Sequence, residues 1–307
     1  MIIVGNLVAG GSGKTPLVLW IAEMLKARGY RPGIVSRGYG GLAAARGEAP
    51  QEVSASSDPT LVGDEPVLLS RRAECPVWVS ADRVAACLSL RLAHPDCDVL
   101  VLDDGLQHYR LARDIEIAVV DARGFGNGCL FPAGPLREPV SRLATVDAVV
   151  SNLGSLSTDS ADNPNKVDTP ATGRYEMRLE GGRFVRLSSG TAGDAESLGA
   201  GRVHAVAGIG DPARFFKHLE SLGLDVVPHP FPDHHVYAAA ELEFGDQAPV
   251  VMTEKDAVKC TQFAAEHGRL WTLPVRAILT AGLDCVIVER LRAAEKLRGR
   301  HRGSETA

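Results

Sequence analysis

The feature that most constrains the fold of this chain lies at its start. There a short apolar strand leads into a glycine-rich turn, which is followed by a helix. The run Ile2 to Val4 precedes Gly10-Gly11-Ser12-Gly13-Lys14-Thr15, and apolar side chains then mark one helical face: Leu17, Ile21, Met24 and Leu25. Such a turn directs backbone N–H groups, and the positive end of the helix dipole, at phosphate oxygens. The full pattern has a glycine where this chain has Val8. The strand–loop–helix context still predicts a phosphate-binding loop.

In a loop of this kind the lysine reaches the β- and γ-phosphates and the following hydroxyl holds Mg²⁺. Lys14 and Thr15 occupy these two positions. A second element supports this interpretation. The apolar strand Val99 to Leu102 ends in Asp103 and Asp104, and an aspartate at such a strand end lies beside the Mg²⁺ in nucleotide hydrolases and kinases. Together the two elements predict a magnesium–nucleotide site.

Short apolar strands alternate with helical patterns along the first half, which predicts a parallel sheet with helices on both faces. Residues 151–172 are polar and turn-rich, two strand-like runs flank Gly181-Gly182, and a second α/β pattern follows. We therefore expect an α/β protein: a nucleotide-binding α/β/α domain over 1–172, a β-hairpin linker over 173–188 and a second, smaller α/β domain over 189–307.

Composition excludes several classes of protein. The 307 residues carry 33 Lys and Arg against 38 Asp and Glu, a formal net charge of -5, so we expect no nucleic-acid partner. The sequence has no run of 18 apolar residues, and because it begins with an apolar strand we expect no signal peptide. The six cysteines show no C-x-x-C spacing, and reduced cysteines fit the cytosol.

Three further motifs are ambiguous from the residues alone. Asn165-Lys166-Val167-Asp168 matches a guanine-recognition element, but no apolar strand precedes it, so we interpret it as a chance match. Val62-Gly63-Asp64-Glu65-Pro66 fits either a helix N-cap or a base for an acceptor hydroxyl. Phe231-Pro232-Asp233-His234-His235 fits a polar loop or a weak metal site, because adjacent histidines point apart.

Several sequence blocks between residue 4 and about residue 260 resemble one family, the tetraacyldisaccharide 4'-kinases of the lipid A pathway. Besides the loop through Pro16, these are Val4-Gly5-Asn6-Leu7, Ser36-Arg37-Gly38-Tyr39-Gly40-Gly41, Gly63-Asp64-Glu65-Pro66, Asp103-Asp104-Gly105-Leu106-Gln107-His108, Arg123-Gly124-Phe125-Gly126-Asn127, Pro132-Ala133-Gly134-Pro135-Leu136-Arg137-Glu138-Pro139, Ala207-Gly208-Ile209-Gly210, Phe231-Pro232-Asp233-His234 and Thr253-Glu254-Lys255-Asp256-Ala257. The resemblance implies an ATP- and Mg²⁺-dependent kinase. It would transfer the γ-phosphoryl group to the 4'-hydroxyl of tetraacyldisaccharide 1-phosphate and form lipid IVA.

The resemblance also assigns roles to residues. Asp64 would be the base, assisted by His234 from a second domain that closes the cleft, with Lys14 as the third catalytic residue. The nucleotide-binding residues would be Gly10, Gly11, Ser12, Gly13, Lys14, Thr15 and Pro16, and the metal ligands Thr15, Asp103 and Asp104. The substrate would contact Arg37, Glu65, Gln107, His108, Arg137 and Glu138.

Members of the family usually carry an apolar helix before the first strand, whereas residue 1 of this sequence already lies in the expected strand. Either the start codon lies upstream or this chain docks without that helix. We expect a peripheral protein at the cytoplasmic side of the bacterial inner membrane, with no obligate protein partner. The basic residues between Arg290 and Arg302 fit contact with an anionic leaflet or a solvated helix face.

Two other functions are the alternatives to a kinase. One is a nucleotide-dependent switch or metallochaperone with the same loop, and the other is a non-catalytic homologue.

Overall fold

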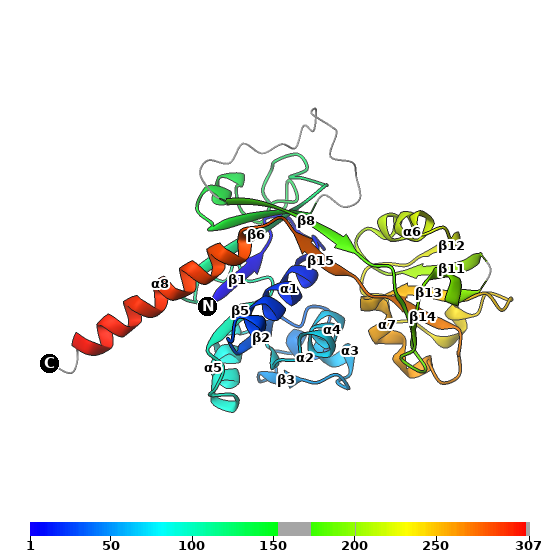
Figure 1. Ribbon diagram of the computed structural model, residues 1–307, viewed down its shortest axis with the longest axis horizontal. Helices are drawn as coiled ribbons and strands as arrows, with labels where there is room; N and C mark the ends of the chain where they lie inside the picture. Colours follow the sequence, from blue (N-terminus) through cyan, green and yellow to red (C-terminus); the bar gives the residue numbers. More distant parts are fainter. Residues whose placement is uncertain (153–172, 200, 305–307) are drawn as a thin grey trace. The chain divides into compact units, whose positions relative to one another are not determined.

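The computed structural model describes residues 1–152, 173–199 and 201–304 (Figure 1). The guanine-like motif at 165–168 lies outside these residues. The described parts form two compact units, and each unit combines separate stretches of the chain. The first unit contains Met1–Ser36, Arg83–Arg178 and the stretch from Ile278, and the second contains Arg37–Asp82 and Leu179–Ala277. This grouping differs from the consecutive division that we expected. The assignment of functions to domains stays a prediction.

The first unit is built on a parallel sheet with strand order β15-β8-β7-β6-β1-β5-β2 (Figure 1). The neighbours from β2 to β8 all run parallel, as expected for strands that are connected through helices. Buried aliphatic side chains fill the central strands. The strands are β1 (Ile2–Gly5), β2 (Pro32–Ser36), β5 (Val99–Leu102), β6 (Ile115–Asp121), β7 (Ala148–Asn152), β8 (Gly173–Glu180) and β15 (Arg276–Leu279).

Helices of the first unit pack on this sheet. Helix α1 (Lys14–Ala27) contacts β1, β2 and β5, helix α5 (Arg83–Ala93) contacts β2, and helix α8 (Leu283–Ser304) contacts β6. The buried face of α1 includes Leu17, Ile21 and Leu25, three of the four residues that predicted the helix. A 3₁₀ turn, η1 (Val140–Ala144), precedes β7. The expected strand–loop–helix order at the start of the chain is confirmed.

The second unit contains a six-stranded sheet of order β10-β9-β14-β13-β11-β12, in which β12, β11, β13 and β14 run parallel. Its strands are β9 (Phe184–Arg186), β10 (Ala192–Gly193), β11 (Arg202–Ala207), β12 (Asp225–Pro230), β13 (Val250–Thr253) and β14 (Leu270–Leu273). Helix α6 (Pro212–Ser221) packs on β11 and β12, and α7 (Glu254–Cys260) on β13 and β14. The unit also contains η2 (Ala195–Leu198), η3 (Ala239–Leu242) and η4 (Thr261–Phe263).

The stretch Arg37–Asp82 belongs to this second unit because its helices pack on α7. Helices α3 (Pro59–Val62) and α4 (Asp64–Ala73) both contact α7. The stretch also contains helix α2 (Leu42–Ala45) and an antiparallel pair, β3 (Gln51–Val53) with β4 (Val77–Val79). Segments far apart in the sequence therefore come together around α4 and α7.

The prediction of a hairpin around Gly181 and Gly182 is wrong. Strand β8 pairs with β7, whereas β9 pairs with β14 and β10, so the two strands belong to different sheets. Two extended runs around a glycine pair predict the strands correctly. They do not determine the partners, because pairing depends on which buried strand edge each run can reach.

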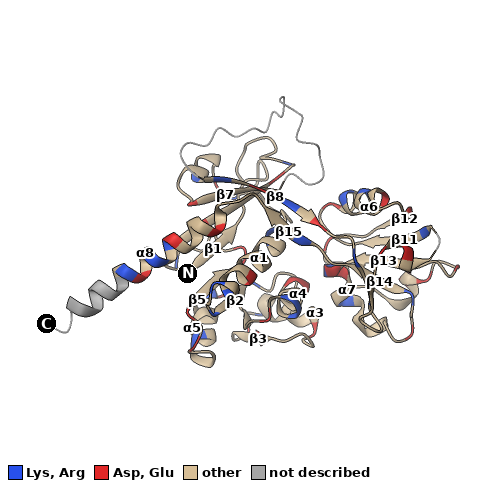
Figure 2. Ribbon diagram, viewed as in Figure 1, with Lys and Arg blue, Asp and Glu red and all other residues tan. Residues whose placement is uncertain are grey.

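None of the described helices is both long and apolar enough to cross a membrane. The longest, α8, carries acidic as well as basic side chains along the part whose side chains are described (Figure 2). One of its arginines, Arg290, forms an ion pair with Asp147 at 2.9 Å.

Helix α5 offers a matched test of the core. The side chain of Leu90 is 0% exposed and that of Leu92, two residues on, is 87% exposed. We expect Leu90→Ala to lower the free energy of unfolding by about 2–5 kcal/mol, because it removes buried contacts and leaves a cavity. Leu92→Ala should change it by less than about 0.5 kcal/mol. Urea unfolding followed by circular dichroism measures both values, and equal losses would contradict this packing.

Candidate functional site

The glycine-rich loop leaves β1 and enters α1 through Gly13, which caps the helix in the left-handed region at φ 84°. A Cβ atom at Gly13 would lie 2.2 Å from the Nδ2 atom of Asn152. That amide, at the end of β7 and 1% exposed, donates a hydrogen bond to the Ser12 carbonyl at 3.0 Å. Glycine is therefore required here both for its backbone angle and for this close approach.

The rest of the loop is held by the segment that follows β6. The Arg123 guanidinium donates to the Gly11 carbonyl at 2.7 Å and is itself held by Asp121 at 2.6 Å. Two backbone bonds add to this, from Ala9 N–H to the Pro135 carbonyl and from Arg137 N–H to the Leu7 carbonyl. The loop is thus fixed by the protein itself. Sequence reasoning gave no role to Arg123, which follows β6, or to Asn152, which ends β7.

Lys14 begins α1, and its Nζ lies 3.3 Å from an Asp104 carboxylate oxygen. Arg137 donates to both oxygens of the same carboxylate, at 3.0 and 2.9 Å. Burial alone would raise the pKa of Asp104, but the two cations outweigh burial and hold this pKa below its usual value. The structure therefore places three predicted site residues in one charged cluster at the loop.

The remaining predicted residues of the first unit lie around this cluster. Gln107 donates to Glu138 at 3.1 Å and to the backbone carbonyl of Asn6 at 3.1 Å. Asp103 is buried and accepts a hydrogen bond from the Ser36 hydroxyl at 3.2 Å. Three further predicted residues are partly exposed. Thr15 and Pro16 lie in the first turn of α1, and His108 follows Gln107. Arg37, which is exposed, and Glu65 belong to the second unit.

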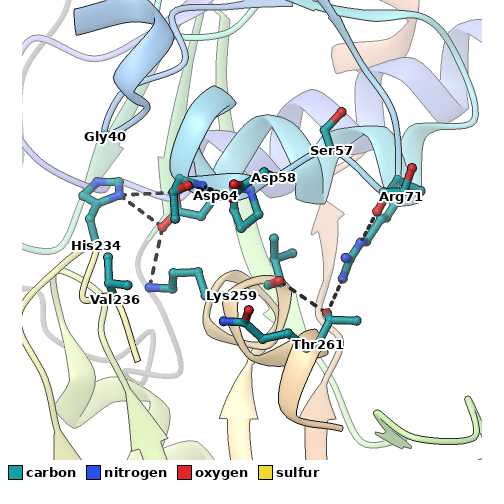
Figure 3. A pocket seen from close by; sticks show the side chains of 15 residues that line it. Gly40, Ser57, Asp58, Asp64, Arg71, His234, Val236, Lys259 and Thr261 are labelled. Atoms are coloured by element: carbon teal, nitrogen blue, oxygen red, sulfur yellow. Dashed lines mark hydrogen bonds and ion pairs between the residues drawn. The ribbon is translucent and has the colours of Figure 1, made fainter. Parts of the chain in front are cut away.

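A second polar cluster lies within the second unit (Figure 3). Asp64 begins α4 and is 4% exposed. The Nδ1 atom of His234 lies 3.2 and 3.1 Å from its two carboxylate oxygens. The Tyr39 ring is 5.1 Å from the imidazole ring. The structure thus brings together the acid and the imidazole that the resemblance selected.

Two lysines of α7 complete this cluster, and sequence reasoning gave neither a role. Lys255 Nζ lies 3.1 Å from Glu65 and 2.9 Å from Asp233. Lys259 Nζ lies 2.9 Å from the buried Asp256 and 3.6 Å from Asp64. The spacing of four residues, which places both lysines on one helix face, was the available signal.

These neighbours set the charges at the pair. Burial alone would raise the pKa of Asp64, but the His234 hydrogen bond and both lysines outweigh it, so this pKa is lowered. The hydrogen bond to Asp64 raises the pKa of His234, against the effects of burial and of Lys255. Asp64 is therefore held as a carboxylate beside a hydrogen-bonding imidazole.

The cluster opens into a cavity of about 590 Å³ (Figure 3). Its walls come from the loop before α3, from both ends of α4, from the loop after β12, and from the end of α7 with η4. The residues are mostly small, polar or charged: Gly40, Ala55, Ser56, Ser57, Asp58, Pro59, Thr60, Asp64, Arg71, His234, Val236, Val258, Lys259, Thr261 and Gln262. Polar groups around a carboxylate suit a ligand that carries hydroxyl groups.

Backbone strain marks both clusters. Among the described residues, the non-glycine residues with positive φ are Glu74, Asp104 at 54° and His234 at 62°. Such conformations cost about 1–3 kcal/mol each and are typical of functional positions. Two of these three residues are thus candidate site residues, one in each unit.

A parallel sheet whose first strand leads through this loop into a helix beginning with lysine defines the class of P-loop nucleotide-binding proteins. The model of the tetraacyldisaccharide-1-P 4'-kinase family matches residues 1–292. Tetraacyldisaccharide 4'-kinase of Dechloromonas aromatica is 52% identical over 96% of this chain and 85% of its own length. That of Aromatoleum aromaticum is 50% identical over 95% and 83%.

A solved structure agrees with this match. A crystal structure of LpxK from Aquifex aeolicus in complex with ATP is 29% identical, with a TM-score of 0.75 over 94% of this chain and 88% of that one. This chain belongs to the tetraacyldisaccharide-1-P 4'-kinase family. The resemblance and the expected fold class are confirmed, and the switch and non-catalytic alternatives are not favoured.

Two glycines of the loop provide a matched test of its geometry. Gly13→Ala should lower the free energy of unfolding by about 1–3 kcal/mol, because it combines a left-handed backbone with a clash against Asn152. Gly11→Ala should change it by less than about 0.5 kcal/mol, since a Cβ there meets nothing within 4 Å. Thermal unfolding without nucleotide measures both, and a tolerated Gly13→Ala would contradict the loop geometry.

Proposed function

We propose that this chain transfers the γ-phosphoryl group of ATP to the 4'-hydroxyl of tetraacyldisaccharide 1-phosphate and so forms lipid IVA. The observation that carries the proposal is the buried Asp64 carboxylate, held by His234 next to a polar cavity. Membership of a kinase family supports it. A switch protein would have no need of such a base.

The first unit binds the nucleotide in this proposal. Backbone N–H groups of the loop from Gly10 to Thr15 contact the phosphates, and Lys14 neutralises their charge. The Aquifex aeolicus structure in complex with ATP supports this choice of nucleotide. In this chain Asp104 already pairs with Lys14, so we expect the lysine to exchange this carboxylate for phosphate oxygens when the nucleotide binds.

Magnesium fits the side chains near the loop. The Thr15 hydroxyl, Asp103 and Asp104 provide the hard oxygen ligands that Mg²⁺ prefers. Within the described residues, no group of three or more His, Cys, Asp or Glu side chains is arranged to hold a metal by itself. This suits an ion that is held by one or two protein oxygens and by phosphate. When bound, it would neutralise charge on the phosphates.

Asp64 is the proposed base. A sugar hydroxyl is a weak nucleophile, and a carboxylate that accepts its proton assists attack on phosphorus. His234, as the donor of a hydrogen bond, orients that carboxylate. Attack in line also requires the hydroxyl to reach the phosphoryl group held at Lys14. The closing movement of the second domain stays a prediction.

The substrate carries a phosphate and many hydroxyl groups, and the proposed contacts match both. Arg37 and Arg137 are cations for anionic oxygens, and Glu65, Gln107, His108 and Glu138 can bond hydroxyl groups. Because the substrate is a lipid, we propose peripheral binding at the cytoplasmic face of the inner membrane. The expected absence of nucleic-acid and obligate protein partners stays a prediction.

Two substitutions separate nucleotide binding from chemistry. Asp64→Asn should lower the rate of phosphoryl transfer by about 100-fold or more, because an amide cannot accept the proton, while ATP still binds. Lys14→Ala should weaken ATP binding and transfer together. Calorimetric titration with ATP, and transfer of labelled phosphate to detergent-dispersed tetraacyldisaccharide 1-phosphate, measure the two properties. Near-full transfer by Asp64→Asn would contradict the assignment of the base.

A further inference from the structure

The Lys255 ammonium contacts the His234 ring on the side that faces away from Asp64. Its Nζ is 3.3 Å from His234 Nε2, the ring nitrogen that faces away from Asp64. The same Nζ reaches Glu65 at 3.1 Å and Asp233 at 2.9 Å. An ammonium has three hydrogens and no lone pair. All three hydrogens therefore have an acceptor, and one of these acceptors is the imidazole.

This geometry fixes the protons of the ring. Burial alone would lower the pKa of Lys255, but Glu65, Asp64 and Asp233 raise it, so the side chain stays charged. A charged lysine can only donate, so Nε2 must present a lone pair. Nδ1 then carries the hydrogen that Asp64 accepts. A second proton on the ring would place an N–H against an ammonium.

We propose that Lys255 is a positioning residue that opposes a second proton on the His234 imidazole, so that Asp64 acts as a free base beside a neutral ring instead of as half of an ion pair. This inference rests on the proposed kinase function. An imidazolium would bind the carboxylate more tightly and reduce its affinity for the proton of the substrate hydroxyl. A neutral ring still orients the carboxylate through Nδ1–H.

The other groups around the His234 ring do not oppose a second proton on Nε2. Lys259 lies on the side of Asp64, 3.6 Å from its carboxylate. The Tyr39 ring lies 5.1 Å from the imidazole ring, at an angle of 56° between the ring planes. Asp233, 3.8 Å from Nε2, would favour a second proton on the ring instead of opposing it. Lys255 is thus the cation that faces Nε2 in the described structure.

Protonation of His234 can be measured without substrate. In ¹⁵N-histidine-labelled protein, long-range ¹H–¹⁵N spectra distinguish a protonated ring nitrogen from one with a lone pair. We expect the wild-type ring to show Nδ1–H and an unprotonated Nε2 at mildly alkaline pH. In Lys255→Met the titration midpoint should move to higher pH, because Asp64 still favours the imidazolium and the opposing charge is gone.

Matched variants separate charge from structure. Lys255→Arg keeps a cation and should keep the wild-type midpoint, whereas Lys255→Gln, a neutral donor, should shift it as Lys255→Met does. His235 serves as the internal control, because its Nε2 faces Glu241 at 3.1 Å instead of Lys255, so its signals should be the same in every variant. Spectra of His234→Gln and His235→Gln assign the two signals.

Activity gives the second readout. At neutral pH we expect Lys255→Met to lower kcat by about tenfold, less than the loss in Asp64→Asn, with the KM for ATP changed less than about twofold. The acidic limb of its pH–rate profile should move to higher pH, and Lys255→Arg should restore both. An unchanged His234 midpoint in Lys255→Met, or a protonated Nε2 in the alkaline wild type, would overturn the proposal. Expected titrations without any lipid phosphorylation would instead contradict the kinase function alone.

Discussion

The burial of the Asp64 carboxylate is the constraint on which the candidate catalytic site depends. A carboxylate removed from water is costly unless cations and hydrogen-bond donors surround it. In this protein His234 provides the donor and Lys259 a nearby positive charge. Lys259 is shared with Asp256, which also accepts hydrogen bonds from Thr253 and Tyr237. Removing one of these groups therefore leaves the remaining buried charges without a partner, which costs free energy.

This constraint explains why the second unit is built from separate stretches of the chain. Helix α4 supplies the carboxylate, the loop after β12 supplies the imidazole, and α7 supplies both lysines. The contacts of α3 and α4 with α7 hold these parts together. In the first unit the phosphate-binding loop is organised in a similar way. Asn152 and Arg123 hold it from two other segments, so its shape does not depend on glycines alone.

Local features of the fold could be predicted from the sequence. The strand, loop and helix around Lys14 follow from residues that are neighbours in the chain, and the structure has them as expected. The hairpin at Gly181 could not be judged in this way, because partner choice depends on distant strands. The grouping of Arg37–Asp82 with residues after 178 depends likewise on packing between α4 and α7.

The candidate site, too, could be predicted from the sequence only in part. Asp64 and His234 are 170 residues apart, and Lys255 and Glu65 are 190 apart. The residues alone left Asp64 undecided between a helix cap and a base, and only the family resemblance selected it together with His234. Lys255 lies in a block that carried the resemblance and Lys259 lies two residues after it, but their roles depend on distances that the sequence does not contain.

The central claim is that this chain phosphorylates one particular hydroxyl group of a lipid. The most direct test is the position of the new phosphate after wild-type protein has reacted with ATP, Mg²⁺ and tetraacyldisaccharide 1-phosphate. Two-dimensional ¹H–³¹P spectra of the purified lipid product locate it. We predict a second phosphate monoester coupled to the proton at carbon 4' of the distal sugar. Phosphate at another carbon, or release of inorganic phosphate alone, would contradict the account.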